Sequence, residues 1–329
     1  MTELFRTPVT ITPLKKLLDY HASIFMVGSC FSENIFVKLK THKFNVSGNP
    51  SGIIYNPVSI SRCITRLIEN KRYIADELFF HDGLYRSFDH HTSFSDSDIN
   101  LVLDKINGSF DSAYEFLCRT DLVIITLGSA FVYELRENQR IVANCHKLPD
   151  REFTRRLLTV NEIVDSLVTT VDKLLTLNPS MQIVFTVSPV RHLRDNAHEN
   201  CVSKAYLITS INQLQDNYSQ VSCFPSYELM LDELRDYRFY NADMVHPSDV
   251  AIDFIWNRFC RFCFDSKTLD FIRMYQPVLA SMNHRIQTSD PVKIAQFTLS
   301  IRKMLNTIKD RFPDLQLETE YMWLENYGK

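Results

Sequence analysis

Short apolar segments rich in β-branched residues recur along the chain, and each is followed by a segment with the apolar spacing of a helix. They span residues 23–27, 121–127, 182–187 and 220–224. This alternation predicts a parallel sheet with helices on both faces. Because ligands of such sheets bind beyond the carboxyl ends of the strands, we expect the functional residues directly after these segments.

Two longer segments interrupt the alternation. Residues 79–97 are polar, contain histidines and are too irregular for a core element, so we expect a long loop over the site, within a lid-like insertion around residues 76–98. Residues 132–149 alternate between apolar and polar side chains on either side of residues 137–139, and this alternation predicts a β-hairpin.

The pattern changes after residue 264, where strand segments stop and two helical stretches remain. The second begins at Ser289-Asp290-Pro291, a typical helix start. Its apolar residues form one stripe: Ile294, Phe297, Ile301, Met304 and Ile308. We therefore predict an α/β domain over residues 1–264 and a C-terminal helical hairpin over 265–329. Packing on the main domain is the favoured role of the stripe, and a homodimer through these helices is the alternative.

Charge and composition narrow the class of partner. The 36 basic and 39 acidic residues give a net charge of -3, which favours neither nucleic acid nor an anionic membrane. No apolar run reaches the roughly 18 residues of a membrane span, and the first 16 residues do not resemble a signal peptide. We expect a cytoplasmic protein whose eight scattered cysteines are mostly buried free thiols.

Neither a cofactor nor a metal is expected. Seven glycines in 329 residues leave no glycine-rich phosphate loop and no dinucleotide fingerprint. The polar residues of the predicted lid lack the spacing of a standard metal site. They are His81, Asp82, Asp89, His90 and His91. Substrate binding is the favoured role of this segment, with His90 and His91 as candidate contacts, and a surface loop is the alternative.

Gly28-Ser29-Cys30 follows the first predicted strand, where the chain turns into a helix predicted over residues 31–39. Gly28 allows a sharp bend and the close approach of a substrate. A helix N-terminus lowers the pKa of a thiol, and its free N–H groups can stabilise an oxyanion. The alternative is that Ser29 caps the helix and Cys30 is a small buried apolar residue.

An acid and a histidine, Asp243 and His246, lie three residues apart before Pro247, which is well suited to open a helix. The carboxylate could fix the imidazole tautomer and leave the other ring nitrogen as a base toward Ser29 or Cys30. A capping aspartate beside a surface histidine gives the same string, so this pair gains weight only together with the nucleophile turn.

Eight short motifs follow one another along the chain. They are Gly28-Ser29-Cys30-Phe31-Ser32, Gly52 with Asn56-Pro57, His81 with Gly83, Ser87 with His90-His91, Gly128, Asn144 with His146-Lys147, Ser188-Pro189 with Arg191-His192, and Asp243 with His246-Pro247. Over roughly residues 20–260 this set resembles the GSCFA family, which is similar to the SGNH (GDSL-like) hydrolases. The resemblance implies a flavodoxin-like three-layer α/β/α sandwich of the SGNH-hydrolase type, with a central parallel sheet and a hydrolase or acyltransferase site.

The same resemblance assigns the nucleophile by register. The SGNH motif reads Gly-Asp-Ser, and aligning its glycine with Gly28 places Cys30 under the nucleophilic serine, while Ser29 stays a second candidate. A cysteine needs less activation than a serine, and its thioester intermediate suits both hydrolysis and acyl transfer. Asp243 and His246 then complete the catalytic set.

For the oxyanion, the resemblance implies three donors: the N–H of the nucleophile, a glycine N–H and an asparagine amide. Gly52 is similar to the glycine. Gly128-Ser129 lacks the asparagine, so Ser129 or Asn56 would have to donate in its place. Gly128 alternatively only lets a strand end tightly.

Arg191 and His192 follow a predicted strand, so they could bind an anionic or sugar group, or merely cap a helix. We therefore expect an esterase or acyltransferase acting on an acylated carbohydrate or another small ester. Because the oxyanion asparagine is missing, the alternative is an inactive protein that binds a carbohydrate or another small ligand.

Overall fold

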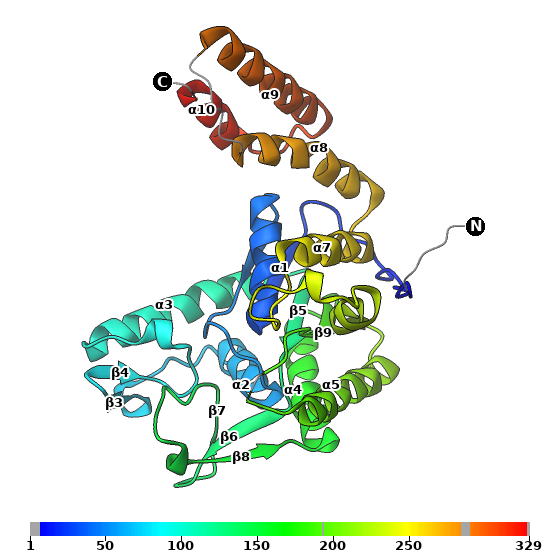
Figure 1. The fold of residues 1–329 in the computed structure, drawn as a ribbon. Helices are drawn as coiled ribbons and strands as arrows, with labels where there is room; N and C mark the ends of the chain where they lie inside the picture. Colours follow the sequence, from blue (N-terminus) through cyan, green and yellow to red (C-terminus); the bar gives the residue numbers. More distant parts are fainter. Residues whose placement is uncertain (1–6, 193, 284–289, 328–329) are drawn as a thin grey trace. The chain divides into compact units, whose positions relative to one another are not determined.

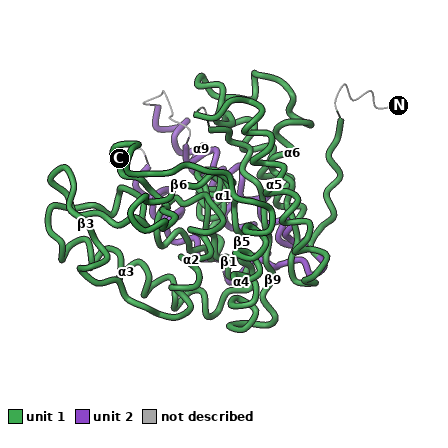
Figure 2. The backbone as a smooth tube through the Cα atoms, turned by 90° about the horizontal axis from the view of Figure 1, so that it is seen from below, with its two compact units in different colours: residues 1–14, 21–262 green, residues 15–20, 263–329 purple. Residues whose placement is uncertain are grey.

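The structure is a computed structural model that describes residues 7–192, 194–283 and 290–327. The chain forms two compact units, which Figure 2 distinguishes by colour. The first unit comprises residues 1–14 and 21–262, and the second comprises residues 15–20 and 263–329.

A five-stranded parallel sheet forms the centre of the first unit. Its strands are β1 (Ser23–Gly28), β2 (Asn45–Gly48), β5 (Leu122–Leu127), β9 (Gln182–Val187) and β10 (Val221–Phe224). Their order is β10-β9-β5-β1-β2, and every neighbouring pair is parallel. Counted along the chain, this is the flavodoxin-like order 2-1-3-4-5. The predicted α/β sandwich with a central parallel sheet is thus confirmed.

Helices flank both faces of this sheet (Figure 1). On one side lie α2 (Pro57–Ile68), α3 (Ile99–Leu117), α4 (Val160–Leu177) and α5 (Ala197–Asn217). On the other, α1 (Cys30–Thr41) lies beside α7 (Asp249–Cys263), and the rings of His42 and Trp256 contact each other at a centroid distance of 5.2 Å.

Burial on both faces explains why the central strands read as continuous apolar runs. All six residues of β1 and all six of β5 are buried. Alternate side chains such as Phe25, Val123 and Phe185 pack with Ile64 of α2 and Leu167 of α4 in one core. Strands that lie between two layers of helices are buried on both faces, so their sequences are apolar throughout instead of alternating.

The predicted loop over residues 79–97 is partly wrong, because it contains a small β-hairpin. Strands β3 (Phe79–His81) and β4 (Leu84–Arg86) pair antiparallel around Asp82 and Gly83, which both have positive φ angles, 50° and 75°. An Asp-Gly pair favours this type of two-residue turn, so the sequence did carry a signal for it.

The hairpin predicted over residues 132–149 is present as β6 (Phe131–Leu135) and β7 (Ile141–Val142). A third strand, β8 (Phe153–Leu157), adds to β6 and was not predicted. Its polar middle hides the strand signal: Arg155 lies 3.8 Å from the ring centroid of Phe131, and Arg156 pairs with Glu134 at 2.7 Å.

The described residues of the second unit form the helices α8 (Ser266–Asn283), α9 (Pro291–Arg311) and α10 (Glu318–Asn326). Asp290 caps α9 by accepting a hydrogen bond from the N–H of Val292, while Ser289 of the predicted helix start lies outside the described residues. From the predicted stripe, Ile301 and Ile308 are fully buried. Within the described ranges, every helix is too short or too polar to span a bilayer.

Candidate active site

The candidate site lies at the carboxyl ends of β1 and β5, where the strand order of the sheet reverses. Cys30 opens α1 directly after β1 and its turn residue Ser29, and Gly128 directly follows β5. This reversal is the topological switch point at which doubly wound sheets bind their ligands.

The turn after β1 is held against β5. Gly28 has a φ of 146°, and a Cβ atom there would lie 2.3 Å from the carbonyl oxygen of Thr126. The N–H of Gly28 donates to Oδ1 of Asn49 at 3.0 Å, and that of Ser29 donates to the same Thr126 oxygen at 3.1 Å. Only glycine fits this conformation and this clearance.

The structure brings together Cys30, His246 and Asp243. The Sγ of Cys30 lies 4.0 Å from Nε2 of His246, and Nδ1 of His246 lies 2.7 Å from Oδ2 of Asp243. An ionised carboxylate only accepts hydrogen bonds, so Nδ1 carries a proton. In the neutral imidazole, Nε2 then presents its lone pair to the thiol.

Asp243 also shapes the turn that carries the histidine. Its Oδ1 accepts hydrogen bonds from the N–H groups of Val245 and His246, both at 2.9 Å. These two bonds, together with the one from the His246 ring, lower the pKa of Asp243 to about 2. The carboxylate is therefore ionised at any working pH, as an orienting group requires.

Cys30 and Ser29 differ sharply in their surroundings. Burial raises the pKa of Cys30, while the N–H of Phe31 and the charge of Lys204 lower it in part. The Ser29 residue is 3% exposed, and its hydroxyl has no hydrogen-bond partner among the described residues. Of the two candidate nucleophiles, only Cys30 thus presents its side chain to His246.

Two of the expected oxyanion donors, Gly52 and Asn56, already donate to other groups. The N–H of Gly52 donates to the carbonyl oxygen of Asn49 at 2.7 Å. Asn56 caps α2: its Oδ1 accepts the N–H of Ser59 at 2.8 Å, and its Nδ2 donates to Oγ of the same residue at 2.9 Å. The hydroxyl of Ser129 accepts the N–H of Phe131 at 3.0 Å. Donation by Gly52 or Asn56 to a substrate would require one of these bonds to break or rearrange. The Ser129 hydroxyl accepts its bond from Phe131 and keeps its own proton, with Oγ of Ser203 at 3.4 Å.

The first turn of α1 offers a different set of donors. The N–H groups of Phe31 and Cys30 both face the Cys30 sulfur and stabilise its thiolate form. N–H groups at a helix N-terminus have no carbonyl partner within the helix, and the helix dipole favours negative charge there. This turn can therefore stabilise an oxyanion that forms beside Sγ.

Sequence reasoning missed Lys204 of α5, which is only 2% exposed. Its Nζ donates to the carbonyl oxygens of Gly128 at 2.6 Å and Ser188 at 2.7 Å, so it joins the ends of β5 and β9. Burial lowers the pKa of Lys204 to about 7. The only sequence signal was its helical spacing with buried Leu207 and Ile211.

Replacing Lys204 by methionine is expected to lower the free energy of unfolding by about 2 kcal/mol. The two carbonyl groups would be left without a donor, at about 1–3 kcal/mol each, partly offset because no charge remains buried. Urea unfolding measures the change. The control is Lys173→Met, which breaks an exposed pair with Glu69 and should cost less than about 1 kcal/mol. Equal stability of the two variants would contradict the anchoring role.

The histidines of the predicted lid do not join the Cys30 cluster. His90 is 1% exposed, accepts or donates one bond with Oγ of Ser87 at 2.8 Å, and packs against the ring of Tyr73. Burial lowers its pKa to about 3, so it is neutral. His91 lies instead beside Gly52, where a Cβ atom would come within 2.5 Å of the His91 Cβ.

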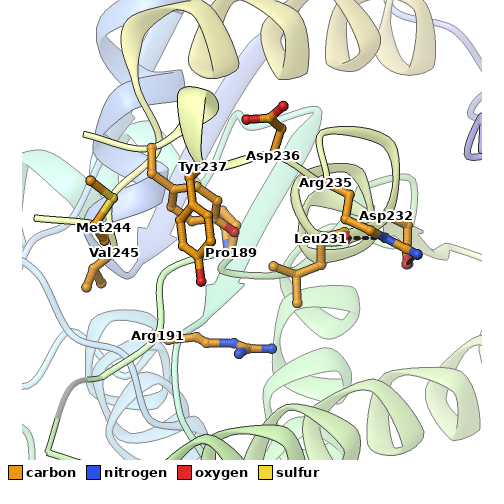
Figure 3. Close-up of a pocket in the computed structure, with 10 residues that line it drawn as sticks. Pro189, Arg191, Leu231, Asp232, Arg235, Asp236, Tyr237, Met244 and Val245 are labelled. Carbon is orange, nitrogen blue, oxygen red and sulfur yellow. Dashed lines mark hydrogen bonds and ion pairs between the residues drawn. The ribbon is translucent and has the colours of Figure 1, made fainter. Parts of the chain in front are cut away.

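Arg191 lines a cavity of about 520 Å³ beside the loop that carries His246 (Figure 3). Pro189 follows β9 on one side of it, and Met244 and Val245 contribute the wall next to the histidine. His192 is not among the described residues that line this cavity, and its ring lies 5.1 Å from that of Tyr55. Burial lowers the pKa of His192 to about 4.

Within the described part of the chain, no three histidine, cysteine, aspartate or glutamate residues converge as a metal site would require. Cys260 and Cys263, whose spacing resembles half of a zinc site, are both buried in α7.

A family model and several solved structures are similar to this chain. The model of the GSCFA family matches residues 23–259. No curated protein matches the chain. A family 3 carbohydrate esterase from Talaromyces cellulolyticus is 9% identical, with 77% of this chain and 98% of that one covered, at a TM-score of 0.35. The Clostridium thermocellum family 3 carbohydrate esterase is 12% identical, with 77% of this chain and 98% of that one covered, at a TM-score of 0.33. The acetyl xylan esterase Est2A from Butyrivibrio proteoclasticus is 11% identical, with 81% of this chain and 66% of that one covered, at a TM-score of 0.38.

Proposed function

The chain belongs to the GSCFA family, and from this membership and the geometry at the switch point we propose that it is a cysteine-dependent ester hydrolase or acyltransferase. One observation carries the proposal: Nε2 of His246 lies 4.0 Å from Sγ of Cys30 while its Nδ1 lies 2.7 Å from Asp243. A nucleophile, a base and a group that orients the base are the parts that covalent acyl transfer requires.

The first half-reaction forms a thioester. Nε2 of His246 takes the thiol proton as Sγ of Cys30 attacks the carbonyl carbon of the ester, and the carbonyl oxygen becomes an oxyanion near the N–H groups of Cys30 and Phe31. The oxyanion collapses, the C–O bond breaks, and His246 returns the proton to the departing alcohol. The 4.0 Å between Sγ and Nε2 is a long sulfur–nitrogen hydrogen bond, and catalytic hydrogen bonds tighten when the substrate binds.

The second half-reaction releases the acyl group. His246 removes a proton from water or from an acceptor hydroxyl, whose oxygen attacks the thioester carbon. The C–S bond then breaks, and the thiolate of Cys30 regains the proton from His246. Water gives a carboxylic acid, whereas an acceptor alcohol gives a new ester. We propose an acylated carbohydrate or another small ester as the substrate, since a cavity of about 520 Å³ beside His246 suits a small molecule.

A second candidate function is ligand binding without turnover. It is favoured by the oxyanion side of the site, where the N–H of Gly52 and the amide of Asn56 both serve local turns and caps. Loss of one oxyanion donor slows such reactions by about 10²–10³. A site that relies on the first turn of α1 alone would be slow or inactive.

Intact-mass measurement after incubation with p-nitrophenyl acetate tests the enzyme proposal. We expect one acetyl group per chain, located by peptide mapping on Cys30. His246→Ala should slow adduct formation by about 10²–10⁴, the usual contribution of a general base. Because Cys201 is exposed, Cys201→Ala controls for nonspecific acetylation and should keep the adduct. If a varied panel of activated esters gives no adduct and no turnover, this result favours the function of ligand binding without turnover.

A further inference from the structure

The cavity beside His246 shares a wall with the catalytic loop. Met244 and Val245, the two residues before His246, line it together with Arg191 and the aromatic side chains of Tyr237 and Tyr240. Figure 3 shows the Arg191 side chain extending along one side of this space. In the proposed reaction His246 returns a proton to the departing alcohol, so the alcohol must lie on the side of His246.

The charged residues of the cavity are not equally free to bind a ligand. Arg235 pairs with Asp232 at 2.7 Å, which the dashed line in Figure 3 marks. Asp236 accepts the N–H of Arg238 at 2.9 Å and pairs with its guanidinium at 3.5 Å. These acidic side chains and Arg235 are therefore already compensated.

Arg191 differs from them. Of the residues that the structure describes, no carboxylate lies within ion-pair distance of it, and its Nη2 donates only to the hydroxyl of Tyr227 at 3.3 Å, with Sγ of Cys201 at 3.8 Å. Its Nε is buried and has no hydrogen-bond partner among the described residues. The side chain as a whole is half-buried, so its guanidinium offers the cavity a positive charge that no described carboxylate neutralises.

We infer that this cavity receives the alcohol portion of the ester, or the acceptor alcohol, and that Arg191 binds a carboxylate or phosphate group on it. The inference rests on the proposed function for its chemistry and on the unpaired guanidinium for its charge. A guanidinium presents two parallel N–H groups to the two oxygens of such an anion. Arg235, the other arginine among the described residues that line the cavity, is already paired with Asp232. Arg191 is thus a specificity-determining residue, separate from the bond-breaking machinery.

Turnover of two matched esters tests the selectivity. Phenyl acetate and 3-acetoxybenzoate differ by one carboxylate on the leaving alcohol, and the ratio of their kcat/KM values cancels general losses of activity. Arg191→Gln should reduce the preference for the anionic ester about tenfold or more, as expected for the loss of a charge-assisted hydrogen bond. Arg72→Gln, which removes an exposed arginine outside the cavity that pairs with Asp111 at 2.9 Å, should leave the ratio within about twofold.

Binding of non-reacting ligands separates this inference from the proposed function. Calorimetry with 3-hydroxybenzoate and with phenyl phosphate should show weaker binding to Arg191→Gln than to wild type, and the tighter of the two identifies the anion. This result would support the anion site even if no ester were turned over. If wild type and Arg191→Gln bind both ligands equally, and the ester ratio is unchanged, the inference is overturned.

Discussion

Replacing Cys30 by alanine is expected to abolish turnover of activated esters, with kcat falling by about 10⁶, the scale found when a triad nucleophile is removed. The alanine protein keeps His246 and Asp243 but has no atom that can form the acyl-enzyme. Steady-state hydrolysis of p-nitrophenyl acetate measures the loss, and the acetyl adduct should disappear with it.

Ser29→Ala is the matched control for this result. The Ser29 hydroxyl is buried and has no partner among the described residues, so its removal should change kcat by no more than a few-fold. An active Cys30→Ala protein together with an inactive Ser29→Ala protein would transfer the role of nucleophile to Ser29.

The pH dependence of thiol reactivity follows from the surroundings of Cys30. Burial raises the pKa of this thiol, so the free thiolate forms at higher pH than in an ordinary cysteine. The alkylation rate of Cys30, followed by peptide mapping with iodoacetamide, should therefore keep rising into the alkaline range. A plateau already reached near neutral pH would contradict this.

Asp89→Asn is expected to lower the free energy of unfolding by about 3 kcal/mol, within the range for breaking a buried ion pair. The Asp89 side chain is 8% exposed; its Oδ1 lies 3.0 Å from Arg62 and its Oδ2 lies 2.6 Å from Arg140. Urea unfolding measures the loss. The control is Asp111→Asn, which breaks an exposed pair with Arg72 and should cost less than about 1 kcal/mol.

The difference in the free energy of unfolding between wild type and Asp89→Asn should depend on pH. Burial alone would raise the pKa of Asp89, but Arg140 and Arg62 outweigh it and lower the pKa. An aspartate with a lowered folded pKa stabilises the protein above its unfolded value of about 3.9, and this stabilisation is lost as pH falls through the folded value. The gap between wild type and Asp89→Asn should therefore narrow below about pH 4. An equal gap at neutral and acidic pH would argue against the ion-pair explanation.

The architecture was largely predictable because burial on both faces leaves a direct trace in the sequence. The segments over β1, β5, β9 and β10 are apolar throughout or nearly so, and they were recognised. Strand β2 was missed because it is short, lies at the sheet edge and exposes part of its polar sequence. Strand β8 was missed because ion pairs and an aromatic contact, instead of apolar packing, hold its arginines.

The site was predictable only where chain order and topology determine it. The residues after β1 and the distant pair Asp243 and His246 meet as expected, while their chemical roles stay predictions. Hydrogen bonds that close turns and caps cannot be read from residue type alone, so Asn56 looked like a free donor although it caps α2. Asp89 looked like part of an exposed loop because its partners Arg62 and Arg140 lie 27 and 51 residues away in the chain.

The narrow clearance at Gly28 has a consequence for variation in this protein. Because the turn rests on the main chain of β5, at Thr126, the location of the Cys30 sulfur depends on backbone atoms that side-chain substitutions leave in place. The exposed residues of α1, such as Val37 and Lys40, can therefore be substituted widely without moving the Cys30 thiol. Redesign of this surface for solubility or attachment is thus decoupled from the chemistry at the opposite end of the same helix.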